Sequence, residues 1–255
     1  MPLVYAQHAP GPGLADAVRC YWTIRGDASD APVVNRVLPD NCIDVIFNLR
    51  PGASFEALVV GPMLTAEVLQ HRAAVDMLGV RFRPGAATEF LDCRAGEVAA
   101  REFAAVELWD DATSLRSQLQ EMPDARFAIL EAYLLRRRRT WRHAFLARHA
   151  TAVIERTHGL MTVERLTQTL GMSERKLQRT FEVAVGLGPK QVLRVQRFRA
   201  AASMVLGSRR ASLSAIAASY GYADQAHMTR DFGALAGLSP REFRSEKRLV
   251  GFIQD

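Results

Sequence analysis

The sequence predicts two domains: a mainly β domain with flanking helices, followed by an all-α domain of two similar helical units joined by a helix. Three observations support this prediction. Short apolar segments interrupted by glycine and proline fill the first part of the chain. Apolar residues at helical spacing fill the last part, where one stretch occurs twice in similar form. The two parts also carry opposite net charge.

Charge divides the 255 residues into two parts. Residues 1–135 carry a net charge of −7, and residues 136–255 carry +13. An acidic part joined to a basic part indicates two functions in one chain. The basic part is typical of a phosphate binder, although a generic cationic surface has the same composition. The hydrophobic fraction of 49% and the charged fraction of 24% are those of a globular protein.

Four segments of the first part are predicted to be strands: Val18–Ile24, Asn41–Leu49, Leu58–Val60 and Leu78–Phe82. In the second of these, apolar residues alternate with polar ones. The apolar face holds Ile43, Val45, Phe47 and Leu49, and the other face holds Asp40, Cys42, Asp44 and Asn48. Short strands with such punctuation are typical of a sandwich or a barrel.

The polar face of this strand is the best candidate for a polar group inside the β domain. Arg81 and Arg83 share one face of another strand. We therefore take Asp44, Arg81 and Arg83 as candidate contacts for a small-molecule effector. A structural salt-bridge cluster is the alternative interpretation of the same charges.

A helix is predicted over Asp124–Arg139, and it ends in four consecutive arginines. Its apolar face holds Phe127, Leu130 and Leu134. If this face has no partner within its own domain, it predicts a homodimer formed through the N-terminal half. The arginines form either a solvated helix end or a phosphate contact at the domain junction. We place the domains at residues 1–140 and 141–255.

The function is indicated most strongly by residues 161–182. Thr162 is a good N-cap for a short helix, Gly171 supplies a left-handed turn, and Ser173 can cap the next helix. Leu177 and Phe181 form the inward side of this second helix. Its outward side offers Arg175, Gln178 and Arg179. Two helices around a glycine turn, with long polar donors on the second, are typical of a helix-turn-helix.

A second unit of the same kind spans residues 212–233. Gly221 makes its turn and Asp224 is the N-cap of its second helix. Met228 and Phe232 point inward. The outward side chains are Gln225, His227 and Arg230. Arginine and glutamine side chains can form bidentate hydrogen bonds with base edges in the major groove.

The likeness of the two units extends past their helices. Arg179-Thr180-Phe181 precedes Gly186-Leu187-Gly188-Pro189-Lys190 at the same spacing as Arg230-Asp231-Phe232 precedes Gly237-Leu238-Ser239-Pro240-Arg241. A constant offset of 51 residues relates the two frames. Residues 190–206 are predicted to form the helix that joins the units, with Val192, Val195, Phe198 and Val205 available for packing.

With these motifs, residues 151–248 resemble the DNA-binding domain of the AraC/XylS family of transcription regulators. The resemblance implies that the second helix of each unit enters one of two successive major-groove segments. Carried over by position, the base readers are Arg175, Gln178, Arg179, Gln225, His227 and Arg230. Asp231, next to Arg230, departs from the family pattern. Its negative charge either orients Arg230, accepts a hydrogen bond from cytosine or repels phosphate. The second helix is therefore the less certain base reader.

The first part of the chain resembles a cupin-like sensor domain that is often fused to such regulators. The resemblance rests on the phrases Cys20-Tyr21-Trp22, Val37-Leu38-Pro39-Asp40, Val60-Gly61-Pro62 and Leu78-Gly79-Val80-Arg81-Phe82-Arg83-Pro84-Gly85. It implies a β-barrel with a regulatory role.

Several classes of protein do not fit the sequence. Three cysteines without a CxxC pair predict neither a disulfide framework nor a zinc site. No catalytic motif, metal-ligand set or cofactor fingerprint is present. The first residues lack the pattern of a secretory leader, and no apolar run is long enough to cross a bilayer. We expect no enzyme, no cofactor, no bound metal, no membrane contact and a cytoplasmic location.

Two functions fit these observations. In the first, a bacterial transcription regulator binds double-stranded operator DNA under the control of a ligand or partner at the N-terminal domain. In the second, the regulator has no small-molecule effector, and its N-terminal domain serves only dimerisation or contact with polymerase. RNA polymerase is an expected partner in both.

Overall fold

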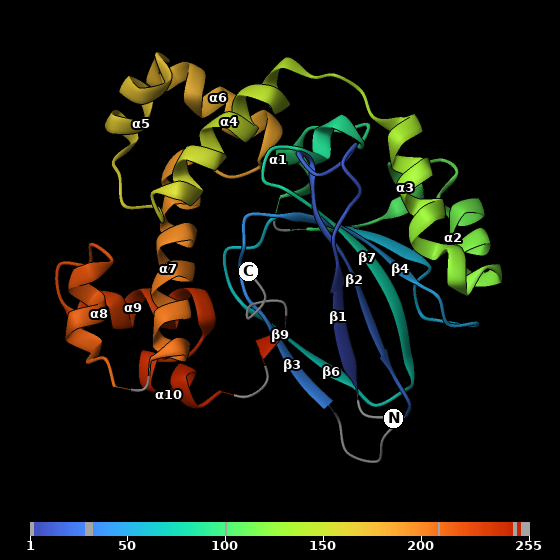
Figure 1. The fold of residues 1–255 in the computed structure, drawn as a ribbon, viewed down its shortest axis with the longest axis horizontal. Helices are drawn as coiled ribbons and strands as arrows, with labels where there is room; N and C mark the ends of the chain where they lie inside the picture. Colours follow the sequence, from blue (N-terminus) through green and yellow to red (C-terminus); the bar gives the residue numbers. More distant parts are fainter. Residues whose placement is uncertain (1–2, 29–32, 100, 209, 247–248, 251–255) are drawn as a thin grey trace.

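The structure, a computed structural model, describes residues 3–28, 33–99, 101–208, 210–246 and 249–250. Strands dominate up to residue 82, and helices dominate after it. Figure 1 shows the sheets and the first helices on one side of the molecule and the later helices on the other. The predicted order of a mainly β domain and an all-α domain is confirmed. Within the described residues, no helix has the length and apolarity that a membrane span requires.

A six-stranded antiparallel sheet forms the centre of the N-terminal domain. Its order is β1-β2-β7-β4-β5-β8. The strands span Val4–His8 (β1), Val18–Gly26 (β2), Val75–Phe82 (β7), Ile43–Asn48 (β4), Ala57–Val60 (β5) and Glu102–Ala104 (β8). The four predicted strands correspond to β2, β4, β5 and β7. Strand order was not predictable, because β2 pairs with β7 across about fifty residues of intervening chain.

A smaller sheet completes the domain and includes residues near the end of the chain. Its order is β6-β3-β9, with β6 spanning Glu67–His71, β3 spanning Val33–Val37 and β9 spanning Leu249–Val250. β3 pairs with β6 in antiparallel and with β9 in parallel orientation. The last strand therefore returns from the helical domain to the N-terminal sheet.

Helices cover one face of the six-stranded sheet and bury its apolar residues. Ile43, Val45 and Phe47 of β4 lie in this core, as their alternation predicted. The helices are α1 (Ala95–Val98), α2 (Ala112–Glu121) and α3 (Arg126–Arg137). Leu130 and Leu134 of α3 are fully buried in the same core. The idea that this helix has no partner within its own domain is therefore wrong.

Three of the four arginines at the end of α3 and directly after it form ion pairs within the protein. Arg137 pairs with Asp92, and Arg138 pairs with Asp16 and with the buried Glu89. Arg139 also reaches Asp92. Acidic groups distant in sequence pair with the half-buried Arg137 and Arg138, whereas Arg136 and Arg139 are exposed, as a solvated helix end predicts.

Seven helices of the described residues build the C-terminal domain: α4 (Arg142–Arg156), α5 (Val163–Leu170), α6 (Glu174–Ala184), α7 (Pro189–Gly207), α8 (Leu213–Ser219), α9 (Gln225–Ala236) and α10 (Pro240–Ser245). The turns α5–α6 and α8–α9 contain Gly171 and Gly221, with φ of 60° and 66°. The side chains of Ser173 and Asp224 cap α6 and α9. Both predicted helix-turn-helix units are present.

Helix α7 belongs to the cores of both units. Val192 and Leu193, near its beginning, pack with Phe181 of α6. Val195, Phe198 and Val205 pack with Phe232 of α9 in the second core. One continuous helix therefore holds the two units in a fixed relation.

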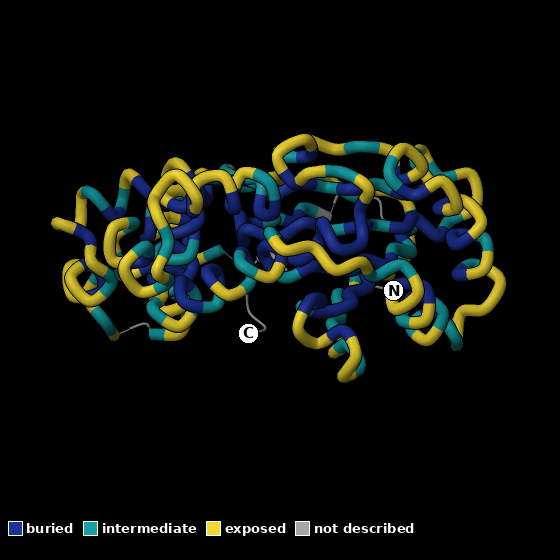
Figure 2. Tube along the Cα trace, turned by 90° about the horizontal axis from the view of Figure 1, so that it is seen from above, coloured by how far each residue is buried: buried dark blue, intermediate teal, exposed yellow. Residues whose placement is uncertain are grey.

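The N-terminal domain contacts both helix-turn-helix units. On the side of the first unit, Arg148 of α4 pairs with Glu89, and Thr151 Oγ1 donates to Pro84 O at 3.0 Å. On the side of the second unit, Arg36 Nη1 donates to Ala236 O at 2.9 Å. Buried residues continue from one domain into the other in Figure 2. The helical units therefore lie against the sheet domain.

Gly159, between α4 and α5, provides a test of this packing. Its φ is +69°, and an added Cβ would lie 2.3 Å from Leu193 O of α7. Gly171 has a similar φ of +60° but open space around it. We expect Gly171→Ala to cost about 1–2 kcal/mol of unfolding free energy, because the left-handed conformation disfavours a side chain. Gly159→Ala should cost about 1–3 kcal/mol more, because α7 must also shift.

Urea denaturation of the two variants measures this difference. Equal losses in the two proteins would show that α4 and α7 do not approach as closely as the structure has them.

Candidate nucleic-acid interface and ligand pocket

Helix α6 presents the predicted readers of the first unit to solvent. Arg175, Gln178 and Arg179 are exposed, while Leu177 and Phe181 are buried beneath them. The three outward side chains make no hydrogen bond or ion pair with other described residues. Two guanidinium groups and one amide are therefore available to a ligand, and these groups form bidentate bonds with guanine and adenine edges.

The three predicted base-reading side chains of α9 differ in their exposure to solvent. Gln225 and Arg230 are exposed and have no partner among the described side chains. His227 is half-buried, its Nδ1 accepts from the Ala223 N–H at 3.4 Å, and its ring packs edge-on against Tyr222 at 5.2 Å. The imidazole therefore supports the turn before α9, and only part of it faces outward.

Asp231 does not lie on the outward face of α9. Its side chain is buried, and Oδ1 accepts from Arg194 Nε of α7 at 2.8 Å. The expectation that its charge orients Arg230, accepts from cytosine or repels phosphate is wrong, because α7 provides a cation on the inner side. Asp231 therefore does not oppose Arg230 on the outer face of α9.

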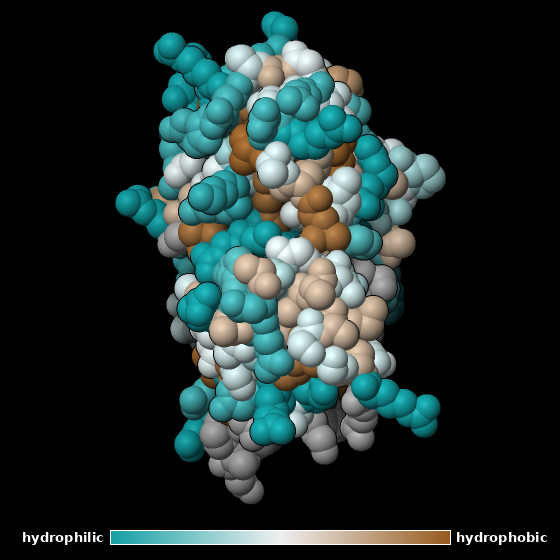
Figure 3. Space-filling model, turned by 90° about the vertical axis from the view of Figure 1, so that its left-hand side faces the viewer, coloured by the Kyte–Doolittle hydropathy of each residue, from teal (hydrophilic) through white to brown (hydrophobic). Residues whose placement is uncertain are grey.

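Hydrophilic side chains project from the side of the molecule that carries α5, α6, α8 and α9 (Figure 3). Sequence reasoning had not singled out Lys176 or Arg165, which are exposed on α6 and α5. With Lys190 at the beginning of α7, they add cations around the first unit. Cations beside a recognition helix are typical of contacts to the phosphate backbone.

A pocket of about 330 Å³ lies within the N-terminal domain, between the six-stranded sheet and the smaller sheet. Its wall is mainly apolar and includes Tyr5, Trp22, Ile24, Ile46, Phe55, Met63, Leu69 and Met77. Its polar lining includes Asp40, Asp44, Glu67, His71, Arg81 and Glu102. The volume lies at the lower end of the range of small-molecule sites, about 300–1,000 Å³.

Arg81 is the centre of a buried ion cluster at one end of the pocket. Its Nη2 and Nε donate to Asp44 at 2.7 and 3.0 Å, and its Nη1 lies 3.1 Å from Asp40 Oδ2. Burial raises the pKa of Asp40, but the guanidinium groups of Arg81, Arg199 and Arg19 outweigh this effect and lower it. Burial raises the pKa of Asp44, and the charge of Asp40 adds to this rise.

The third candidate residue, Arg83, lies elsewhere. It follows the end of β7, and its Nε donates to Ala15 O at 2.9 Å. It does not line the pocket. The structure therefore brings Asp44 and Arg81 together and leaves Arg83 apart.

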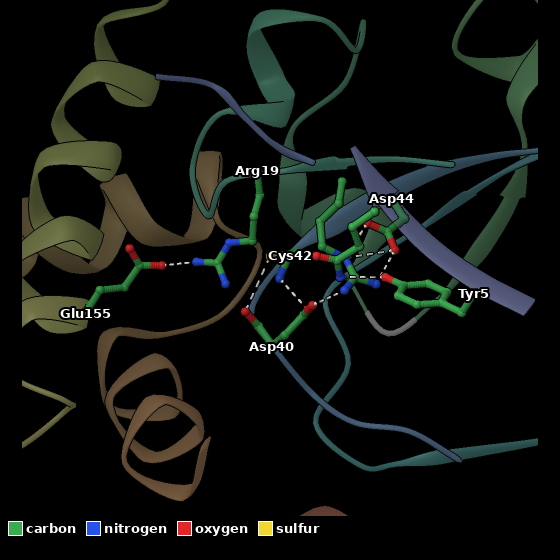
Figure 4. A network of polar contacts seen from close by, with 8 residues as sticks. Tyr5, Arg19, Asp40, Cys42, Asp44 and Glu155 are labelled. Atoms are coloured by element: carbon green, nitrogen blue, oxygen red, sulfur yellow. Dashed lines mark hydrogen bonds and ion pairs between the residues drawn. The ribbon is translucent and has the colours of Figure 1, made fainter. Parts of the chain in front are cut away.

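The loop that carries Asp40 connects the pocket to the helical domain. Leu38 is buried in the core of the second unit, and Asn41 Nδ2 donates to Val192 O of α7 at 3.3 Å. Beside this loop, Arg19 pairs with Glu155 of α4. Figure 4 shows polar contacts extending from Tyr5 past Asp40 toward Glu155. A change at the pocket therefore has a short physical route to α7.

Residues 166–246 match the protein family described as a helix-turn-helix domain. The C-terminal part of the chain is a helix-turn-helix domain of the AraC type. The match covers α6, α7 and the whole second unit, so it includes the exposed faces of both α6 and α9. This match supports DNA binding by the C-terminal domain, as in a regulator of transcription. Residues 6–104 match a domain of unknown function, DUF6597, which covers most of the strands that line the pocket.

Several solved structures are similar to parts of the chain. The C-terminal domain of AraT, a response regulator from Geobacillus stearothermophilus, is 24% identical, with 45% of this chain and 95% of that chain covered and a TM-score of 0.39. An AraC-type transcriptional regulator from Chromobacterium violaceum is 21% identical, covering 38% and 86%, with a TM-score of 0.35.

ToxT from Vibrio cholerae is 9% identical over 87% of this chain and 96% of that chain, with a TM-score of 0.46. TM-scores this low do not by themselves establish a shared fold. No curated protein matches the sequence significantly.

The cysteines of this regulator are poor nucleophiles. Burial raises the pKa of Cys20 and of Cys93 to about 11 and raises that of Cys42 well above its usual value. The thiols are therefore protonated at neutral pH, and the protonated form is unreactive. Cys42 belongs to the pocket lining, where it acts as a small apolar group.

Proposed function

We propose that the protein is a sequence-specific bacterial transcription regulator that reads operator DNA with α6 and α9 and whose DNA affinity is set by a ligand in the N-terminal pocket. The observation that carries the DNA part is the pair of helices with free arginine and glutamine side chains on one shared scaffold helix. The observation that carries the ligand part is the pocket and its short connection to that scaffold.

The two helix-turn-helix units carry an exposed arginine at equivalent positions. Arg179 and Arg230 each precede the buried phenylalanine of their helix by two positions, and both are exposed. Because α7 packs into both cores, the two helices cannot move independently. This arrangement supports two half-sites about 10 base pairs apart, one turn of DNA. Gln178 and Gln225 add amide groups suited to adenine, and Arg175 and His227 lie at the edges of the two faces.

Ligand control is favoured over a purely structural N-terminal domain by the pocket itself. A domain that serves only dimerisation has no need of a cavity lined by aromatic residues and a buried ion cluster. Asp40 lines this cavity, and the adjoining Asn41 bonds to α7. A ligand that moves this loop changes the position of α7, and with it the relation of the two reading helices.

The proposal also includes RNA polymerase and a second copy of the chain as partners. The N-terminal domain offers apolar surface for such contacts at Val106, Met122 and Leu135, which are 53%, 46% and 48% exposed. A regulator of this kind acts in the cytoplasm, where chromosomal DNA is found.

Base reading is tested with Arg179→Ala and Arg230→Ala on an operator selected from random DNA by the purified protein. Each substitution should cost about 1–3 kcal/mol of binding free energy and relax the preference at one base pair, because a bidentate contact is lost. The two relaxed positions should lie about 10 base pairs apart. Binding to all single-base variants at fixed salt measures both effects.

Arg72→Ala is the control, since it removes an exposed arginine of the N-terminal domain. A uniform loss on every sequence would show that the arginine in question contacts phosphate and reads no base.

Coupling between the domains is tested with Asn41→Gly. Glycine accepts the positive φ of 64° at this position but lacks the amide that donates to Val192 O. Loss of one such bond should change DNA affinity by about threefold or more, because the constraint on α7 is weakened. Gln120→Ala is the matched control, since it removes a similar bond to Leu49 O within the N-terminal domain. Equal effects of the two variants would contradict control through this loop.

A further inference from the structure

The apolar part of the pocket suits a ligand with an aromatic or similarly bulky body. Tyr5 and Trp22 are stacked with ring centroids 6.3 Å apart, and both line the cavity with Phe55. Met63 and Met77 add flexible side chains that adapt to an irregular shape. Aromatic faces of this kind also attract a cation.

The charges of the pocket are strongly unequal. Among the described lining residues there are four carboxylates, Asp40, Asp44, Glu67 and Glu102, against the single guanidinium of Arg81. Asp40 and Asp44 are paired with Arg81, whereas Glu67 and Glu102 are exposed lining residues without an ion pair among the described residues. These two glutamates favour a ligand of the opposite sign.

Arg81 is not available to a ligand carboxylate. Three of its nitrogen–oxygen contacts, at 2.7, 3.0 and 3.1 Å, go to Asp44 and Asp40. Asp40 also interacts with Arg199 and Arg19, so the carboxylates at this end are already balanced by cations. An anionic ligand would meet two carboxylates before it displaced either from the arginine.

Glu67 and Glu102 provide negative charge that no cation balances. Neither forms an ion pair with another described residue. Arg101 lines the adjoining outer recess with them but pairs with neither. Burial, and then the negative charge of Glu102, raise the pKa of Glu67. A cation placed between the two glutamates would relieve this repulsion.

One buried polar atom of the pocket wall has no partner among the described residues. This atom is Nε2 of His71, and burial lowers the pKa of this histidine. A neutral imidazole with its proton on Nδ1 accepts a hydrogen bond at Nε2. Unsatisfied polar atoms at a cavity indicate that its occupant carries a polar group.

We propose that the pocket binds an amphipathic cation, with its apolar body against Trp22 and Tyr5 and a protonated amine directed toward Glu67 and Glu102. This inference rests on the proposed ligand control and names the chemistry of the ligand. It predicts that the pocket binds an aliphatic or aryl-alkyl amine more tightly than neutral or carboxylate-bearing molecules of the same shape.

Three matched probes separate these classes: 4-phenylbutylamine, 4-phenylbutanol and 4-phenylbutyrate. Titration calorimetry with the full-length protein at pH 7 should show that the amine binds about tenfold or more tightly than the alcohol, and the alcohol more tightly than the acid. Equal or tighter binding of the acid would overturn the inference, and so would the absence of binding by the amine.

Substitutions identify the site. Glu67→Gln combined with Glu102→Gln should weaken binding of the amine about tenfold and leave binding of the alcohol unchanged. Glu107→Gln combined with Glu121→Gln, at exposed positions outside the pocket, is the matched control. An equal loss in the control variant would show that the amine responds to overall charge and not to this pocket.

DNA affinity distinguishes failure of the inference from failure of the proposed function. Amine bound in the pocket without any change in DNA affinity would contradict ligand control and leave the ligand class standing. Binding of the acid together with a change in DNA affinity would retain ligand control and overturn the ligand class.

Discussion

The buried guanidinium of Arg81 holds together the sheet and the loop that leads to the helical domain. Two aspartates, one from β4 and one from the loop before it, pair with this guanidinium, and Arg199 and Arg19 act on Asp40 as well. Asp44 belongs to the sheet, whereas Asp40 belongs to a loop whose next residue bonds to α7. The cluster therefore joins the floor of a pocket to the scaffold of the DNA-binding domain.

Helix α7 contacts the loop that carries Asp40 and packs against both helix-turn-helix units. Its first turns pack with α6 and its later turns with α9, so a displacement of the helix alters the positions of both α6 and α9. The exposed Arg194 of α7 pairs with Asp231 of α9, and the buried Arg199 lowers the pKa of Asp40. The residues of α7 thus couple the sheet domain to the second unit, in addition to joining the two units.

Local chemistry made the helical domain predictable. Gly171 and Gly221 require left-handed turns, and Ser173 and Asp224 cap the helices that follow, all within a few residues of sequence. Alternation along β4 likewise placed Asp44 on the pocket side. Contacts between distant segments were not predictable. Asp231 turns inward because of a cation 37 residues earlier in the chain, and Glu67 meets the Arg81 pocket only through a strand order that no local pattern specifies.

The coupling of pocket and reading helices is tested most directly by comparing Asp40→Asn with Asp44→Asn in the full-length protein. Both variants remove one carboxylate charge from the same guanidinium, but only Asp40 lies on the loop that contacts α7. Thermal melting shows whether each variant is folded, and fluorescence anisotropy at fixed salt measures affinity for the selected operator. Asp40→Asn should change that affinity by about fivefold, with Asp44→Asn close to the unmodified protein. Equal changes in the two folded variants, or no change in either, would contradict control of DNA binding through Asp40.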